Sequence, residues 1–220
     1  MNPLTILSDS LYFFRRNLAS ILTLCLPLVM LEALAKQVLS NALPGNGSTA
    51  YELVVGLLFY PLYTGALILF LDARSRSEYP AARNLLAMAL RMWPTFAVMA
   101  ALSTLLIMFG LSLFIVPGIW VMVKLVFSEY LLVLRGMTPL MAMRGSFAMT
   151  NGHFARILAC VLCIYIPLSL LEGVAIYLLE PQNAGVNFVI DTLSSFLQLF
   201  TSVVMFRLFM LINEPPQSEQ

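Results

Sequence analysis

Two ionisable residues interrupt an apolar run that is long enough to cross a membrane: Lys124 and Glu129, in the stretch PGIWVMVKLVFSEYLLV at 117–133. An ionisable side chain inside a membrane helix costs about 2.5–3.5 kcal/mol on insertion scales, so each one needs a partner, a water-filled cavity or a route to the interface. On one continuous helix these two side chains point about 140° apart, which makes them poor partners for each other. Both residues are therefore candidates for a functional site.

The two residues lie at different expected depths. With about 1.5 Å of rise per residue, Lys124 lies about 9 Å from the outer end of its helix and Glu129 about 16 Å, near the membrane midplane. Arg207, near the inner end of the last predicted helix, is a possible partner for Glu129 if the two helices touch. Four more ionisable residues are expected near the level of Lys124, in the outer third of the membrane, and they are Glu32, Lys36, Glu172 and Asp191.

These residues allow two interpretations. Glu32 and Lys36 are four residues apart, so they can pair on one helix face. In the functional interpretation the cluster lines a polar cavity that opens outward, with Glu129 at its floor. In the alternative, Lys124 and Glu32 extend toward the headgroups, and Glu129 is neutral or paired as a contact between helices.

Other reactive side chains do not form an enzyme site. Cys160 and Cys163 lie in a run of apolar residues, where a thiol is unreactive, and their helix face suits close packing. His153 is the only histidine, and no second histidine or cysteine completes a metal site beside it. The sequence contains no glycine-rich phosphate loop and no serine placed beside a histidine. We therefore expect no enzyme activity, no cofactor and no metal.

The composition indicates an integral membrane protein. Of the 220 residues, 60% are hydrophobic and 10% are charged, whereas soluble domains carry about 25% charged residues. The net charge of +1 gives no attraction to nucleic acid, so we expect no such partner. The three cysteines lie in apolar runs and do not form a disulfide framework.

Six apolar stretches are long enough to span a membrane as helices, a length of about 20 residues each. We expect an all-α fold in one integral membrane domain at 1–220. The first stretch is longer than the apolar region of a signal peptide, so we expect it to be retained. The predicted spans are 17–38, 51–72, 94–114, 117–135, 154–179 and 187–211.

The basic residues indicate the orientation. Ten of the twelve lysines and arginines flank the spans on one side of a six-span path, and the three connectors on the other side contain none. Because cytoplasmic loops carry an excess of basic residues, we expect a bacterial inner-membrane protein with both termini in the cytoplasm.

Amphipathic segments precede the first, third and fifth spans. They start near residues 4, 79 and 138, and each leads into a pair of spans, so the chain is predicted to contain three repeats of an interfacial helix and a hairpin. The alternative is that any loop of this length folds against the headgroups. The residues expected to contact anionic lipid headgroups are Arg15, Arg16, Arg83, Arg91, Arg144 and His153.

Several strings resemble the YciC-like family of bacterial inner-membrane proteins. They are FFRRN at 13–17, VPGI at 116–119, RGSFAMT at 144–150 and, most closely, DTLSSFLQLFTSVVMFRLFMLI at 191–212. The resemblance spans nearly the whole chain and implies the same fold and membrane location. It implies no activity, and Lys124 and Glu129 are not among the residues that carry it.

These observations favour a non-enzymatic role in membrane or envelope lipid homeostasis, through binding or moving a lipid or amphiphile. The basic segments and the outer polar cluster motivate this hypothesis. A transporter of a small polar or cationic solute is the first alternative. A membrane scaffold or assembly factor, with other membrane proteins as partners, is the second.

Overall fold

A computed structural model describes residues 3–42, 48–179 and 184–213, and every regular element in these ranges is an α-helix. The all-α prediction is therefore confirmed. The helices are α1 (Pro3–Arg16), α2 (Leu18–Ala42), α3 (Ser48–Ser75), α4 (Ala82–Leu113), α5 (Ile115–Leu125), α6 (Ser128–Arg135), α7 (Pro139–Met149), α8 (Phe154–Leu179) and α9 (Ala184–Asn213).

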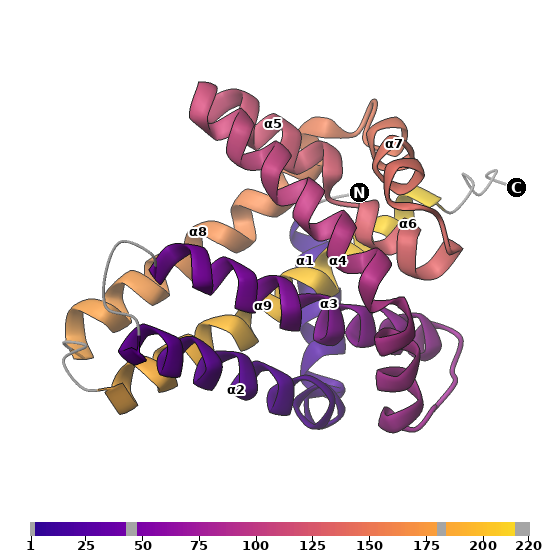
Figure 1. Cartoon of the computed structure of the whole chain (residues 1–220). Coiled ribbons are helices and arrows are strands. Elements are labelled where there is room, and N and C mark those ends of the chain that lie inside the picture. The colour runs from indigo at the N-terminus through magenta and orange to yellow at the C-terminus, as the bar shows by residue number, and fades with distance from the viewer. Residues whose placement is uncertain (1–2, 43–47, 180–183, 214–220) are drawn as a thin grey trace, which may run out of the picture.

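Six segments of these helices are long and apolar enough to cross a membrane, as the sequence predicts. They are Leu18–Leu39, Tyr51–Ser75, Ala82–Leu113, Ile115–Arg135, Phe154–Leu171 and Phe188–Asn213. The helices pair as antiparallel neighbours, α2 with α3, α4 with α5, and α8 with α9. Figure 1 shows the α4–α5 pair reaching away from the rest of the bundle at the upper left.

Helix α3 lies at the centre of the bundle and contacts α2, α4, α6 and α9. Half of its most apolar segment is buried within the protein, compared with 22% for α4. In α3 the buried residues follow one another almost without a break from Tyr63 to Leu71. A helix that is buried on all sides reads as apolar all round, which explains its weak amphipathic pattern.

The third predicted span differs from expectation at its start. The amphipathic segment at 79–93 and the span at 94–114 were expected to be separate, whereas α4 runs through Pro94 without a break. Proline in a helix removes one backbone hydrogen bond but is common in membrane helices, where neighbouring groups compensate. Next to Pro94, the indole Nε1–H of Trp93 donates a hydrogen bond of 2.8 Å to the carbonyl of Leu58 and so links α4 to α3.

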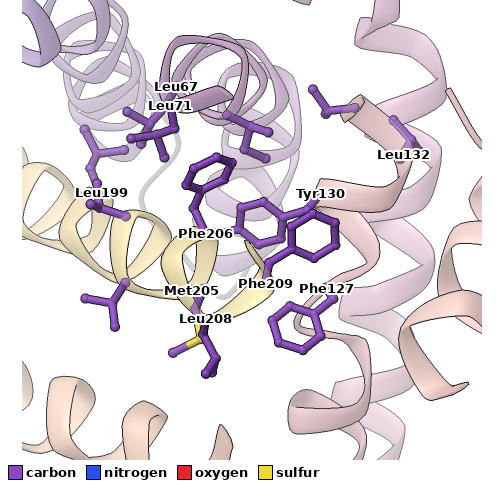
Figure 2. Packing of buried hydrophobic residues seen from close by; sticks show 14 of the residues in the cluster. Leu67, Leu71, Phe127, Tyr130, Leu132, Leu199, Met205, Phe206, Leu208 and Phe209 are labelled. Carbon is purple, nitrogen blue, oxygen red and sulfur yellow. The ribbon is translucent and has the colours of Figure 1, made fainter. Parts of the chain in front are cut away.

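Aromatic residues of α6 and α9 join the two halves of the chain. The ring of Tyr130 stacks on Phe209 at 5.5 Å between centroids and meets Phe206 at 6.2 Å, as Figure 2 shows. Phe127 packs against the other side of the same cluster, 5.8 Å from Phe209. The Tyr130 hydroxyl donates to the carbonyl of Ser202 at 2.8 Å, so the polar end of this buried ring is satisfied.

Candidate functional site

Glu129 lies directly after a break in its membrane-spanning segment. The sequence predicts one continuous span at 117–135, but the structure divides it into α5, which ends at Leu125, and α6, which begins at Ser128. The angle of about 140° between Lys124 and Glu129, worked out for an unbroken helix, therefore does not hold. The break separates the two residues into different helices, and Glu129 lies in the first turn of α6.

Ser146 of α7 makes hydrogen bonds with the backbone at the break between α5 and α6. Its hydroxyl donates a hydrogen bond of 2.6 Å to the carbonyl of Lys124 and accepts one of 3.1 Å from the N–H of Phe127. The hydroxyl of Ser128 donates to the carbonyl of Leu125 at 2.6 Å. Backbone groups inside a membrane have no water to pair with, so a break needs such partners. Since Ser146 is fully buried, it fixes the position at which α6 starts.

The carboxylate of Glu129 has a partner on α3. The hydroxyl of Tyr60 donates a hydrogen bond of 2.6 Å to Oε1 of Glu129. A short bond from a hydroxyl to a carboxylate is about twice as strong as a bond between neutral groups. Tyr60 is positioned in turn by edge-on contacts with the rings of Tyr63 and Phe96.

A cavity of about 250 Å³ surrounds this pair, among α3, α4, α5, α6, α8 and α9. Most of its lining residues are polar, which is unusual among membrane-spanning helices. Three buried hydroxyls that line it have no hydrogen-bond partner, namely those of Thr64, Ser103 and Thr201. Buried hydroxyls normally find partners, so these three are polar groups that the protein itself leaves unsatisfied. The other polar lining residues are Tyr60, Tyr63, Ser128, Glu129, Tyr130, Tyr165, Ser195, Gln198 and Ser202.

The cavity continues toward the C-terminal end of α8 and the start of α9. A smaller space of about 130 Å³ shares Tyr165 and Gln198 with it and adds Ser169 and Ser194. Tyr165 is 39% exposed, so the lining reaches the surface of the protein at this helix. The polar space therefore runs from Glu129 to the outside of the bundle.

Three of the ionisable residues that the sequence predicts to form a cluster, Glu32, Lys36 and Asp191, lie near one another. Nζ of Lys36 lies 2.7 Å from Oε1 of Glu32, which is 4% exposed. Asp191 is close enough to Lys36 to interact with it electrostatically. Glu32 also interacts with Tyr63, which lines the cavity. Tyr63 thus lies between the outer charged pair and the cavity around Glu129.

Lys124 does not join this cluster. Its ammonium donates a hydrogen bond of 2.7 Å to Oδ1 of Asn151, in the connection between α7 and α8, and lies 5.7 Å from the ring centroid of Trp120. Lys124 is only 6% exposed, so the protein covers its side chain. Helix α5, which carries Lys124, packs against α7 and α8, and Asn151 lies in the connection between those two helices.

Arg207 is placed away from Glu129. Arg207 points to Asp9 of α1, with 3.9 Å between the charged atoms, instead of to Glu129. The side chain of Glu172 lies outside the part of the chain that the structure describes. The expected pairing of Glu129 with arginine is therefore replaced by the bond to Tyr60.

The residues proposed for headgroup contact lie at the protein surface with one exception. Arg15, Arg16, Arg83, Arg91 and Arg144 are exposed. His153 is partly buried, and its Nδ1 has no hydrogen-bond partner. Among the described residues, no group of three histidine, cysteine, aspartate or glutamate side chains gathers closely enough to hold a metal ion.

Sequence reasoning missed most of the residues that line the cavity. The tyrosines of α3 and the hydroxyl residues of α9 lie in runs that read as ordinary membrane helix. One signal was available in hindsight. Ser195, Gln198, Thr201 and Ser202 repeat at helical spacing along the inward face of α9, and polar residues in a span usually face the bundle interior.

Comparison with known proteins supports the membrane assignment. The chain is 28% identical over 153 residues to a UPF0259 membrane protein of Yersinia pestis (strain Pestoides F) and equally to one of Yersinia pseudotuberculosis serotype O:1b (strain IP 31758). Each match covers 69% of this chain and 59% of the relative, so the chain spans less than two thirds of these relatives' length. No protein-family model matches the chain, and no solved structure matches it. The chain is thus similar to an uncharacterised group of bacterial membrane proteins.

Proposed function

We propose that this protein is a non-enzymatic component of the bacterial inner membrane that binds an amphiphile and moves it within the membrane. The observation that carries the proposal is the polar cavity around Glu129, with its unpartnered hydroxyls and its connection to the surface at Tyr165. Polar groups inside a membrane are costly to maintain, so a cavity lined by many of them supports a role in binding.

The cavity chemistry favours a head that is cationic or rich in hydrogen-bond donors. Glu129 is the carboxylate of the lining, and no lysine or arginine is among the described lining residues. The volume of about 250 Å³ is below the range of about 300–1,000 Å³ that drug-sized ligands occupy. A single polar headgroup matches this size, while the apolar tail lies outside, against exposed residues of α8 such as Leu162.

A small cation or polar solute is the second candidate ligand. The observation that favours it is the row of polar residues from Gln198 to Ser169 and Ser194, which extends the cavity along α8 and α9. In this alternative the solute passes along the row and has no tail in the lipid.

The proposed location follows from the distribution of charge. Basic residues flank the spans on one side only, which supports an inner-membrane protein with cytoplasmic termini. The similarity to UPF0259 membrane proteins supports a membrane location, and the strings at 13–17 and 191–212 support membership of the YciC-like family.

Native mass spectrometry of the purified protein in lipid nanodiscs tests the proposal. Bacterial lipid extract is supplied, and the lipids that stay bound are identified for the wild type, Glu129→Gln and Tyr60→Phe. Glu52→Gln is the matched control, because Glu52 is an exposed carboxylate on the same helix as Tyr60 and is not in the cavity lining.

We expect an amine-bearing lipid to stay bound to the wild type and the control, and to be lost from both cavity variants. Retention that is equal in all four proteins would refute the cavity as the binding site. Displacement of the lipid by a water-soluble amine without a tail would favour the solute alternative. A protein partner that co-purifies in constant ratio, without bound lipid, would favour a scaffold.

A further inference from the structure

A second polar pocket lies between α2, α3 and the start of α4. The residues that line it are far from Glu129 in the sequence. Its volume is about 290 Å³. The side chains that matter for its chemistry are Arg74 at the end of α3, Tyr79 in the following turn, and the hydroxyl residues Ser20 and Thr23 of α2. No acidic residue is among the described residues that line it.

The guanidinium of Arg74 is held in place but lacks a polar partner. It lies 4.1 Å from the ring centroid of Tyr79 and 5.2 Å from that of Phe70. Its Nε is buried and makes no hydrogen bond. Aromatic rings contact the faces of a guanidinium, so its edge, which carries the N–H donors, stays available to an acceptor.

The neighbouring acidic residue is already paired. Asp72 forms an ion pair with Arg76, with 3.1 Å between the charged atoms. In the described part of the chain no carboxylate is paired with Arg74. Arg74 therefore carries an uncompensated positive charge within a pocket.

The start of α4 adds a second source of positive potential. Ala82, its first residue, lines the pocket, and the preceding residue Ala81 caps the helix without a side-chain hydrogen bond. The first N–H groups of a helix lack partners within the helix and attract anions. Because α4 contains 32 residues, this end carries a full helix dipole.

We propose that this pocket binds a phosphate group. The edge of the Arg74 guanidinium pairs with two phosphate oxygens, as arginine does with planar or tetrahedral oxyanions. The hydroxyls of Ser20 and Thr23 donate to the remaining oxygens; the hydroxyl of Thr23, which now lies 3.0 Å from the carbonyls of Ala19 and Ser20, rotates to do so.

The phosphate belongs either to the headgroup of a phospholipid or to a soluble phosphate compound. Arg74 is the penultimate residue of the candidate span Tyr51–Ser75, so it lies where lipid phosphates are found. This pocket is different from the cavity around Glu129, so a test of phosphate binding here does not depend on the proposed function.

Binding measurements on the intact protein test the inference. The protein is kept in an uncharged detergent that contains no phosphate, graded amounts of phosphatidylglycerol are added, and the bound lipid is quantified by native mass spectrometry. In a second arm, inorganic phosphate is titrated against protein in an uncharged detergent. The variants are Arg74→Gln and Thr23→Val, and Arg76→Gln is the control, since Arg76 is two residues away and does not line the pocket.

We expect Arg74→Gln to weaken phosphate-group binding about tenfold or more, and Thr23→Val roughly threefold, with Arg76→Gln unchanged. A response in the lipid arm alone identifies a headgroup site, and a response to inorganic phosphate identifies a site for soluble phosphates. Equal binding by Arg74→Gln and Arg76→Gln in both arms would overturn the inference. If Arg74→Gln does not fold, Thr23→Val decides, because it preserves the shape of an exposed side chain.

Discussion

The substitution Ser146→Ala removes the side chain that joins the two halves of the broken span. Ser146 is fully buried, and its hydroxyl pairs with the carbonyl of Lys124 at 2.6 Å and with the N–H of Phe127 at 3.1 Å. Each buried polar group left without a partner costs about 1–3 kcal/mol. Since two backbone groups are affected and Ser146 is fully buried, we expect a loss of about 2–4 kcal/mol in the free energy of unfolding.

Equilibrium unfolding by SDS in mixed micelles, followed by circular dichroism, measures this loss. Ser112→Ala is the control, because the hydroxyl of Ser112 also donates to a backbone carbonyl, that of Phe109, but at an exposed site. We expect the control to change stability by less than about 0.5 kcal/mol. A Ser146→Ala variant as stable as the control would refute the argument that this hydroxyl holds the break.

Three further predictions concern the site, the packing of a hairpin and the orientation. In a double-mutant cycle, Tyr60→Phe and Glu129→Gln should show a coupling energy of about 0.6–1.7 kcal/mol in the same unfolding assay, the range that such cycles give for hydrogen bonds between membrane helices. Gly118→Ala should destabilise the protein by about 1–3 kcal/mol, because the added Cβ would lie 2.9 Å from a backbone nitrogen of α4. In a variant without native cysteines, a cysteine at Asn46 should react with an impermeant thiol reagent added outside the cell, and one at Ser75 should not.

Each of these predictions has a result that would contradict it. Coupling below about 0.3 kcal/mol, the value expected for the distant pair Tyr60→Phe and Glu52→Gln, would show that the bond adds nothing. For the hairpin, Gly173→Ala is the control, since an added Cβ there meets nothing within 4 Å. Equal stability of the two glycine variants would be inconsistent with close packing of α4 and α5. Labelling at Ser75 alone would reverse the orientation.

The sequence predicted the membrane-spanning helices because their signal is composition over a long window. Six apolar stretches of sufficient length remain visible whatever the neighbouring helices do. The boundary at Pro94 was harder to predict, because proline ends helices in water but is tolerated in membrane helices.

The candidate site was predictable only in part. The depth of Glu129 identified it as a residue that needs a partner or a cavity, and the structure provides both. The identity of the partner depends on which helices touch, and spacing within one helix carries no such information. The hydrogen-bond partner of Glu129 is therefore Tyr60 and not Arg207, and the partner of Lys124 is Asn151.

The break at Val126 and Phe127 explains why one span can carry two ionisable residues with separate tasks. The break leaves Lys124 on α5, which packs against α7 and α8, and Lys124 anchors the connection between those helices through Asn151. The break also makes Glu129 a residue of the first turn of α6, where the partial positive charge of a helix N-terminus favours an acidic side chain. A continuous helix would place Glu129 mid-helix, without that charge and with its backbone groups already paired. The break is therefore what equips this carboxylate to face a polar cavity inside the membrane.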